Sequence, residues 1–202
     1  KERLRFMAKE AQMVGWISDQ PIPDVLDAIP NWVFSELLTA SEAIADIALP
    51  EIAPSQYAYI LFTSGTTGWP KGVITRHNQV CIMAWNIWDG ALRLREDDRF
   101  LSFTSLNFSA SMIELFGATL KGAQLVITTE REKQDPETLM NLLEQTAVTS
   151  MFIPPIYLSY CRYRELPALH TIILGGDAPH EGLISQWQKS KRIVNAYGCT
   201  ET

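Results

Sequence analysis

The residue types with the clearest capacity for chemistry lie in one stretch, residues 63–72, which reads Thr-Ser-Gly-Thr-Thr-Gly-Trp-Pro-Lys-Gly. Its three glycines let the backbone turn tightly and bring N–H groups close to an anion. Its serine and three threonines supply hydroxyl donors, and Lys71 supplies a positive charge. A simple polar turn does not need this many glycines and hydroxyl groups together with a lysine. We therefore interpret the stretch as a phosphate-binding loop. It is not a Walker loop, because Pro70 stands where that pattern has glycine and Lys71 precedes glycine.

The elements around this loop must position it. From residue 57 onward, apolar runs of strand length alternate with segments of helical periodicity. Strands are expected at 57–62, 100–103, 123–127, 148–153, 171–174 and 193–196, and helices at 77–92, 109–120, 135–145, 155–163 and 180–189. The alternation predicts an α/β fold: a doubly wound, mainly parallel sheet with helices on both faces. Such sheets bind ligands at the carboxyl ends of their strands.

The first part of the chain differs from the rest. It carries five prolines between residues 21 and 54, separated by short apolar groups, which is typical of connecting segments. We expect an N-terminal helix, a strand and a Pro-containing connection over residues 1–56, and an α/β nucleotide- and acyl-binding core over residues 57–202. A length of 202 residues fits one domain, and we expect it to be incomplete.

Composition and charge argue against several classes of partner. Hydrophobic residues make up 47% of the chain and charged residues 20%, as in ordinary globular proteins. The 17 Lys and Arg against 23 Asp and Glu give a net charge of −6, which argues against a nucleic-acid partner. No apolar run is long enough for a membrane span, so no membrane partner is expected. The three cysteines form no CxxC pair, which favours a cytoplasmic location.

Three stretches of the chain resemble one superfamily. Residues 59–73 are similar to the phosphate-loop signature of acyl-adenylate-forming enzymes, which include nonribosomal peptide synthetase adenylation domains, acyl-CoA synthetases and luciferases. Residues 195–201 resemble the motif Asn-x-Tyr-Gly-x-Thr-Glu, and residues 108–114 resemble the substrate-pocket motif Phe-Asp-x-Ser-x-x-Glu. Asn195 favours the peptide-synthetase branch. The likeness covers nearly the whole chain and implies the flavodoxin-like part of a large N-terminal domain.

The resemblance implies a reaction and its partners. A small carboxylic acid is activated with ATP and Mg²⁺ to an acyl-adenylate, and the acyl group passes to the phosphopantetheine thiol of a carrier protein. An acyl- or aryl-CoA ligase, or a non-catalytic structural or binding module, remain alternatives. Catalytic roles are implied for Lys71, Thr200 and Glu201, the last as the Mg²⁺ ligand. The implied nucleotide-binding residues are Thr63, Ser64, Gly65, Thr66, Thr67, Gly68, Lys71, Gly175, Gly176, Asp177, Asn195, Ala196, Tyr197, Gly198 and Thr200.

The resemblance also implies an acyl pocket. Its lining residues are Phe108, Ser109, Ala110, Ile113, Phe152, Ile173, Gly175 and Ala196. Ser109 departs from the family pattern, because amino-acid-activating domains carry Asp there to pair with the substrate's α-ammonium. Serine supplies no charge, and an unpaired ammonium would be costly. The expected substrate lacks an α-amino group or carries its amine elsewhere. An acidic residue outside this chain, or loss of activity, would also explain Ser109.

Other polar residues receive structural interpretations. His170 and His180 have no partner at a meaningful spacing and are expected at the surface. His77 is expected to cap or pack at the start of a helix. The mixed charges of residues 130–133 predict a solvated loop.

Overall fold

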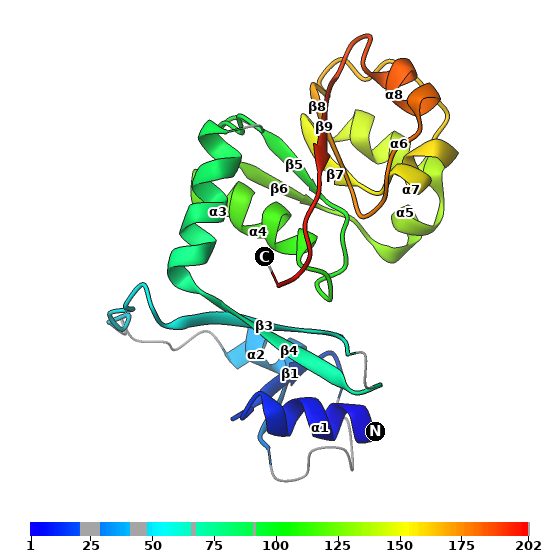
Figure 1. Cartoon of the computed structure of the whole chain (residues 1–202). Helices are drawn as coiled ribbons and strands as arrows, with labels where there is room; N and C mark the ends of the chain where they lie inside the picture. The colour runs from blue at the N-terminus through cyan, green and yellow to red at the C-terminus, as the bar shows by residue number, and fades with distance from the viewer. Residues whose placement is uncertain (21–28, 41–47, 66–67, 91, 202) are drawn as a thin grey trace. The chain divides into compact units, whose positions relative to one another are not determined.

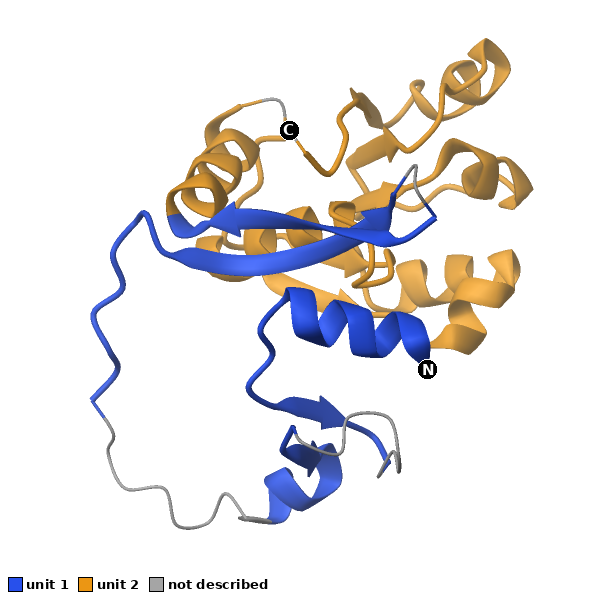
Figure 2. Cartoon of the chain, turned by 60° about the horizontal axis from the view of Figure 1, so that its bottom comes forward, with its two compact units in different colours: residues 1–77 blue, residues 78–202 orange. Residues whose placement is uncertain are grey.

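A computed structural model of the chain describes residues 1–20, 29–40, 48–65, 68–90 and 92–201. It contains two compact units, residues 1–77 and residues 78–202, which Figure 2 distinguishes by colour. By its contacts, the strand at 57–62 that we expected to open the α/β core therefore groups with the N-terminal unit, where it belongs to a hairpin. The assignment of 1–56 and 57–202 as connection and core stays a prediction.

The N-terminal unit consists of short elements and one long hairpin (Figure 1). Its elements are α1 (Glu2–Glu10), β1 (Trp16–Ser18), β2 (Asn31–Val33), α2 (Phe34–Ala40), β3 (Tyr57–Ser64) and β4 (Pro70–Arg76). β1 and β2 pair in parallel, and β3 and β4 pair in antiparallel register. The strand β4 was not expected, and neither were β2 and α2 within the proline-containing segment.

The second unit is built on a five-stranded sheet. Its elements are α3 (His77–Asp89), which begins at the last residue of the first unit, β5 (Arg99–Ser102), α4 (Ala110–Lys121), β6 (Gln124–Ile127), α5 (Glu130–Gln134), α6 (Pro136–Gln145), β7 (Ser150–Ile153), α7 (Pro155–Tyr160), β8 (Thr171–Gly175), α8 (Glu181–Trp187) and β9 (Arg192–Ala196). The strand order is β6-β5-β7-β8-β9, and every neighbouring pair is parallel. This is the flavodoxin-like order, in which the chain reverses its winding between β5 and β7. The predicted fold class is confirmed.

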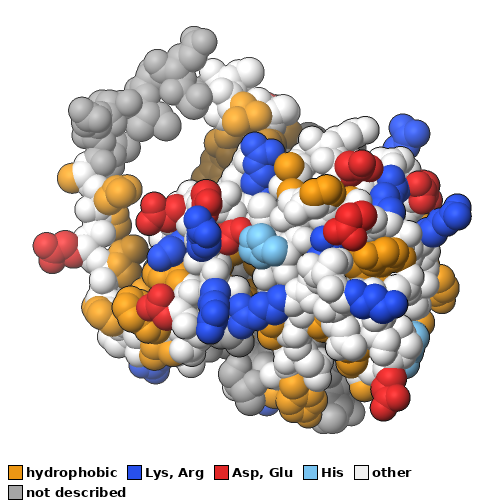
Figure 3. Space-filling model, turned by 90° about the horizontal axis from the view of Figure 1, so that it is seen from above, with side chains coloured by type: hydrophobic (Ala, Val, Ile, Leu, Met, Phe, Trp, Pro, Cys, Tyr) orange, Lys and Arg blue, Asp and Glu red, His pale blue; other side chains and the backbone are white. Residues whose placement is uncertain are grey.

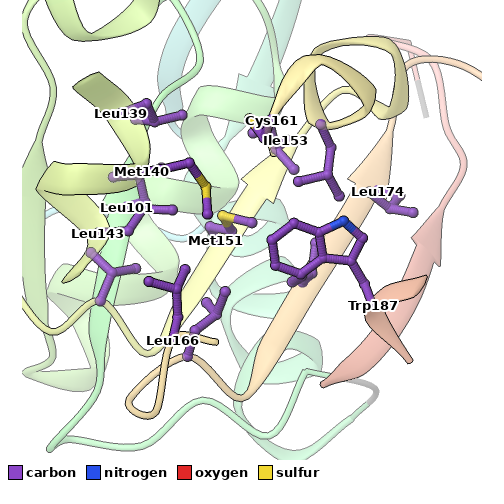
Figure 4. Close-up of a cluster of buried hydrophobic side chains, with 14 of the residues drawn as sticks. Leu101, Leu139, Met140, Leu143, Met151, Ile153, Cys161, Leu166, Leu174 and Trp187 are labelled. Carbon is purple, nitrogen blue, oxygen red and sulfur yellow. The ribbon is translucent and has the colours of Figure 1, made fainter. Parts of the chain in front are cut away.

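Helices cover both faces of this sheet. Successive residues of a strand point to opposite faces, so each strand contributes side chains to the packing on both sides. Phe100 belongs to a cluster beneath α3 and α4, whereas Leu101 belongs to a cluster beneath α6, α7 and α8. We call these the α3–α4 cluster and the α6–α8 cluster. The buried members of the α3–α4 cluster are Ile87, Leu94, Phe100, Ala118, Ala123, Phe152 and Ile173. Figure 4 shows part of the larger α6–α8 cluster, where Met140 and Met151 lie between the helices and the sheet and Trp187 is fully buried.

The helix boundaries follow from local signals. α4 ends at Gly122, whose φ of 83° suits a glycine cap. α6 begins after Asp135, whose carboxylate accepts the backbone N–H groups of Glu137 and Thr138. The prediction of a loop over residues 130–133 is wrong: they lie in α5, where Thr129 and Glu132 form a reciprocal capping box.

Hydrogen bonds tie together the amino ends of three central strands. The buried Asp98 carboxylate accepts the backbone N–H of Arg95 at 2.7 Å, the Thr149 hydroxyl at 2.5 Å, and lies 2.9 Å from His170 Nε2. The backbone continues the connection, because the N–H of His170 donates to Thr149 and that of Arg192 donates to His170. His170 is half exposed but joins two strands, so its expected role as a plain surface residue is incomplete.

Charged side chains of both signs are interspersed on the face shown in Figure 3. The ion-pair group with the most members among the described residues joins Arg164 to Glu137 at 2.7 Å and to Glu144 at 3.2 Å. Within the described part of the chain, no helix has the length and apolar character that crossing a membrane requires.

Candidate functional site

The predicted phosphate loop connects the two strands of the β3–β4 hairpin in the N-terminal unit. The register places Thr63 opposite Lys71 and Ser64 opposite Pro70, so the strands bring both ends of the loop together. The N–H of Gly68 donates to the carbonyl of Gly65 at 3.0 Å. Gly68 has a φ of 84°, a conformation that side-chain-bearing residues rarely adopt. Thr66 and Thr67 lie outside the described residues.

Polar groups of this hairpin are open to solvent. Lys71 and Ser64 are exposed, whereas Thr63 is partly buried and its hydroxyl lies 3.5 Å from the Lys71 carbonyl. Trp69 is 47% exposed, and its ring centre lies 5.0 Å from that of Phe6 in α1. The hairpin therefore presents a cation and a hydroxyl at a tight turn, as binding of an anionic ligand requires.

The other predicted site residues lie in the second unit, at the carboxyl edge of its sheet. β8 ends at the buried Gly175, and Gly176 follows with a φ of 90°. The exposed Asp177 accepts the backbone N–H of Ala178 at 2.7 Å, which fixes its carboxylate in the turn. Gly175 pairs with Ala196 of β9, so the ends of these two strands lie side by side.

The segment after β9 carries the second family motif. Asn195 is exposed in β9, opposite Leu174 of β8. Tyr197 is fully exposed directly after the strand, and its ring is available to stack on a planar ligand. Gly198 and Glu201 are exposed as well, and Thr200 is partly buried.

Most of the predicted acyl-lining residues fall in the α3–α4 cluster. Phe152 and Ile173 are buried there, with Ala110, Ile113 and Ala196 packed against them. These residues come from β7, β8, α4 and β9, so the fold gathers side chains that are widely separated in the sequence.

The remaining acyl-lining residues border this group. A Cβ atom placed on Gly175 would lie 2.4 Å from the tip of the Phe152 ring, so only glycine fits there. Ser109 is partly buried at the N-cap of α4, and its side chain makes no capping hydrogen bond. Phe108 is 65% exposed and lies outside the buried group.

Glu114 belongs to the third family motif, but sequence reasoning gave it no role. It is 1% exposed, and its carboxylate accepts the Thr104 hydroxyl at 2.6 Å and the Thr104 backbone N–H at 3.0 Å. Burial raises the pKa of Glu114 from 4.5 to about 7, although the hydrogen bonds with Thr104 oppose the rise. A carboxyl group in a motif that also contains several acyl-lining residues is a signal that the sequence already carried.

Oxygen donors suited to a hard cation are present, but they are not clustered. Glu201 offers an exposed carboxylate, of the kind that binds Mg²⁺ together with water and phosphate oxygens. Among the described residues, no group of three or more His, Cys, Asp and Glu side chains could hold a metal ion by itself. The donor set fits a cation that arrives with phosphate groups rather than one held in a protein cage.

Comparisons with known proteins identify relatives of this chain. A linear gramicidin synthase of Brevibacillus parabrevis is 32% identical over 204 residues, covering all of this chain and 4% of that protein. Malformin synthetase of Aspergillus niger is 35% identical over 182 residues, covering 90% of this chain and 4% of that protein.

Solved structures share the fold. The N-terminal subdomain of Klebsiella oxytoca NpsA matches with a TM-score of 0.81 and 25% identity, over 99% of this chain and 51% of that one. The chain thus spans a small part of its curated relatives and about half of this solved subdomain. The model of the AMP-binding enzyme family matches residues 2–202. The chain belongs to the family of AMP-binding enzymes.

Proposed function

We propose that this chain forms part of an adenylation domain that activates a carboxylic acid with ATP, giving an acyl-adenylate and pyrophosphate. The observation that carries the proposal is the meeting of the motif-bearing β8 and β9 ends with the α3–α4 cluster at one edge of a flavodoxin-like sheet. Its peptide-synthetase relatives support the same reaction.

Each predicted residue has a role in this reaction. Lys71 and the hydroxyls of the β3–β4 loop bind the β- and γ-phosphates of ATP, and Tyr197 stacks on adenine. Thr200 donates to the α-phosphate, and Glu201 holds Mg²⁺. The turn at Gly175, Gly176 and Asp177 borders both the adenine and the acyl group. When bound, Mg²⁺ supplies positive charge that offsets the negative charge developing at the α-phosphorus.

The substrate proposed is an acid without an α-ammonium group. Ser109 provides no carboxylate at the position that would pair with such an ammonium, and its acyl-lining neighbours are apolar or small. The NpsA subdomain was crystallised in complex with 3-hydroxybenzoyl-AMSN, whose acyl part is a benzoyl group without an α-amino group. An aryl acid is therefore one member of the class to test.

The acceptor proposed is the phosphopantetheine thiol of a carrier protein, because both curated relatives described above are peptide synthetases or synthases. Transfer to free coenzyme A is the alternative that an acceptor assay would detect. A cytoplasmic location is proposed as well, since the three cysteines of the sequence form no CxxC pair.

The proposal is tested by pyrophosphate exchange in a protein that carries this chain within a complete adenylation domain. Paired acids that differ only in the α-amino group are compared. We expect exchange with the desamino member, and about a hundredfold loss in Lys71→Ala through weaker use of the triphosphate. Lys9→Ala, which removes another exposed lysine of the same unit, serves as the control and should match the wild type.

Ser109→Asp tests the acyl pocket separately. It should shift preference toward the 2-amino acid of each pair, whereas Thr119→Asp, which adds the same charge at an exposed position near the end of α4, should not. Unchanged preference in Ser109→Asp would contradict the pocket assignment. Absence of exchange with every acid would favour a non-catalytic binding module.

A further inference from the structure

Glu114 makes an unusual connection for a residue in the middle of a helix. Its buried carboxylate reaches back ten positions to Thr104, where it accepts the hydroxyl at 2.6 Å and the backbone N–H at 3.0 and 3.2 Å. A backbone N–H and a hydroxyl at one residue thus share one charged acceptor. Such charge-assisted hydrogen bonds are stronger than neutral ones.

The connection lies at the point where the sheet reverses its winding. Thr104 follows β5, and β5 has β6 on one side and β7 on the other. The segment 103–109 starts here and ends at Ser109, the N-cap of α4, beside Ala110 in the α3–α4 cluster. Its start is held by Glu114 and by the ring of Phe103, which packs on Tyr157 at 4.8 Å. Its end is held by α4 itself.

Few other charges act on Glu114. Lys133 of α5 favours the ionised form, but its ammonium also lies 3.3 Å from Glu130. Among the strands against which α4 packs, β5 carries only Arg99, at its amino end, and β6 and β7 carry no charged residue. α3, which contacts α4 through the Trp88 indole, has His77 and Asp89 at its two ends. Thr104 is therefore the principal polar partner of this carboxylate among the described residues.

We propose that Glu114 is a positioning residue, which holds Thr104 and thereby fixes the segment 103–109 so that Ser109 and Ala110 meet the acyl group of the substrate. The inference rests on the proposed function, because it assigns Glu114 to recognition of the acid rather than of ATP. It also accounts for a buried carboxyl that no step of adenylation uses.

The arrangement links acid recognition to pH. Hydrogen bonds from Thr104 lower the pKa of Glu114, so they are stronger when the carboxyl is ionised. Since burial brings this pKa to about 7, ionisation near neutral pH tightens the hold on Thr104. The KM for the acid should therefore fall as the pH rises through 7.

The first test compares variants by pyrophosphate exchange in the complete adenylation domain. Thr104→Val should raise the KM for the acid about tenfold and the KM for ATP less than about twofold, and Thr104→Ser should restore the acid KM. Glu114→Gln should remove the change in acid KM near pH 7. Thr119→Val is the control, because it makes the same change at an exposed position of α4, where the Thr119 hydroxyl donates to the carbonyl of Leu115. Its KM values should match those of the wild type.

A second measurement separates this inference from the proposed function. Hydrogen exchange of the backbone amides in residues 104–109 should be at least about fivefold faster in Thr104→Val than in Thr119→Val, with other segments unchanged. An unchanged acid KM, or equal exchange in both variants, would overturn the positioning role. If amide exchange is faster in Thr104→Val but the wild type activates no acid, the positioning of Thr104 by Glu114 stands and the proposed adenylation is overturned instead.

Discussion

The two edges of the five-stranded sheet are built from different residues. At the amino edge, one buried carboxylate, Asp98, joins the starts of β5, β7 and β8 through Thr149 and His170. At the carboxyl edge, β8 ends at Gly175 and is followed by Gly176, and β9 is followed by the fully exposed Tyr197. The first edge satisfies its polar groups internally, whereas the second leaves backbone and aromatic surface open to a ligand.

This difference assigns stability of the sheet to the amino edge and recognition of a ligand to the carboxyl edge. Evenly spaced ladder hydrogen bonds hold parallel strands together along their length, from one edge to the other. The amino edge can therefore stabilise the sheet while residues at the carboxyl edge vary with the ligand. Glu114 is the exception, since it brings a closed hydrogen-bonding arrangement to the carboxyl edge.

The largest expected effect comes from breaking the amino edge. Asp98→Ala leaves the Thr149 hydroxyl, the His170 ring and the Arg95 N–H without their acceptor, and should lower the free energy of unfolding by about 4 kcal/mol. Urea denaturation measures this change. Asp97→Ala removes an exposed carboxylate paired with Arg95 and should cost less than about 0.5 kcal/mol. Equal losses in both variants would remove the distinction between the edges.

The next effect is a pH dependence at the carboxyl edge. Burial raises the pKa of Glu114 from 4.5 to about 7, so the folded chain binds this proton more tightly than the unfolded chain. Its contribution to stability is fully present below pH 4.5 and is lost as the pH rises through 7. The loss is on the order of 3 kcal/mol.

Glu114→Gln has no such proton to lose. Its free energy of unfolding, relative to the wild type, should rise by this amount between pH 4.5 and pH 7. Urea denaturation across that range measures the difference. A difference independent of pH would show that Glu114 is solvated in the folded protein.

A smaller effect is expected where the carboxyl edge allows only glycine. Gly175→Ala forces the Phe152 ring away from a Cβ atom 2.4 Å distant, which should cost about 2 kcal/mol in stability and weaken acid binding. Calorimetry with an acyl-adenylate analogue measures the second effect. Gly182→Ala is the control, because its new Cβ meets His180 at an ordinary 3.4 Å within α8. Wild-type binding by Gly175→Ala would place the acyl group elsewhere.

The smallest effect concerns an element at the carboxyl edge that is independent of the site. Thr129→Ala removes one half of the α5 capping box and should lower the free energy of unfolding by about 1 kcal/mol. Acid binding should not change. Thr119→Ala, which removes an exposed hydroxyl bonded within its own helix, should have almost no effect on stability. Altered acid binding in Thr129→Ala would extend the site to α5.

Sequence patterns predicted the second unit well because its strands are short apolar runs separated by periodic helices. They failed where the signal was local and polar. α5 has no buried residue to create periodicity, although Thr129 and Glu132 have the spacing of a capping box. β4 begins Pro-Lys-Gly and becomes a strand through its pairing with β3. α2 follows a proline-containing segment, and its side chains from Phe34 to Thr39 are all exposed, so it has no buried face that a periodic pattern would reveal.

The candidate site residues come from motifs, and their roles stay a prediction. The family signatures led to Phe152 and Gly175, which lie next to each other in the fold, and to Ser109, which precedes α4. Pairing between distant residues could not be predicted in this way. Asp98 and His170 meet only because β5, β7 and β8 are neighbours, and Glu114 reaches Thr104 only because α4 folds back over β5.

The division of the core into two clusters has an evolutionary consequence. The larger α6–α8 cluster contains more of the buried hydrophobic residues described, while most of the predicted acyl-lining residues belong to the smaller α3–α4 cluster. A mutation that reshapes the proposed acyl pocket therefore acts on the smaller cluster, so selection for another acid leaves the side chains of the larger cluster unchanged.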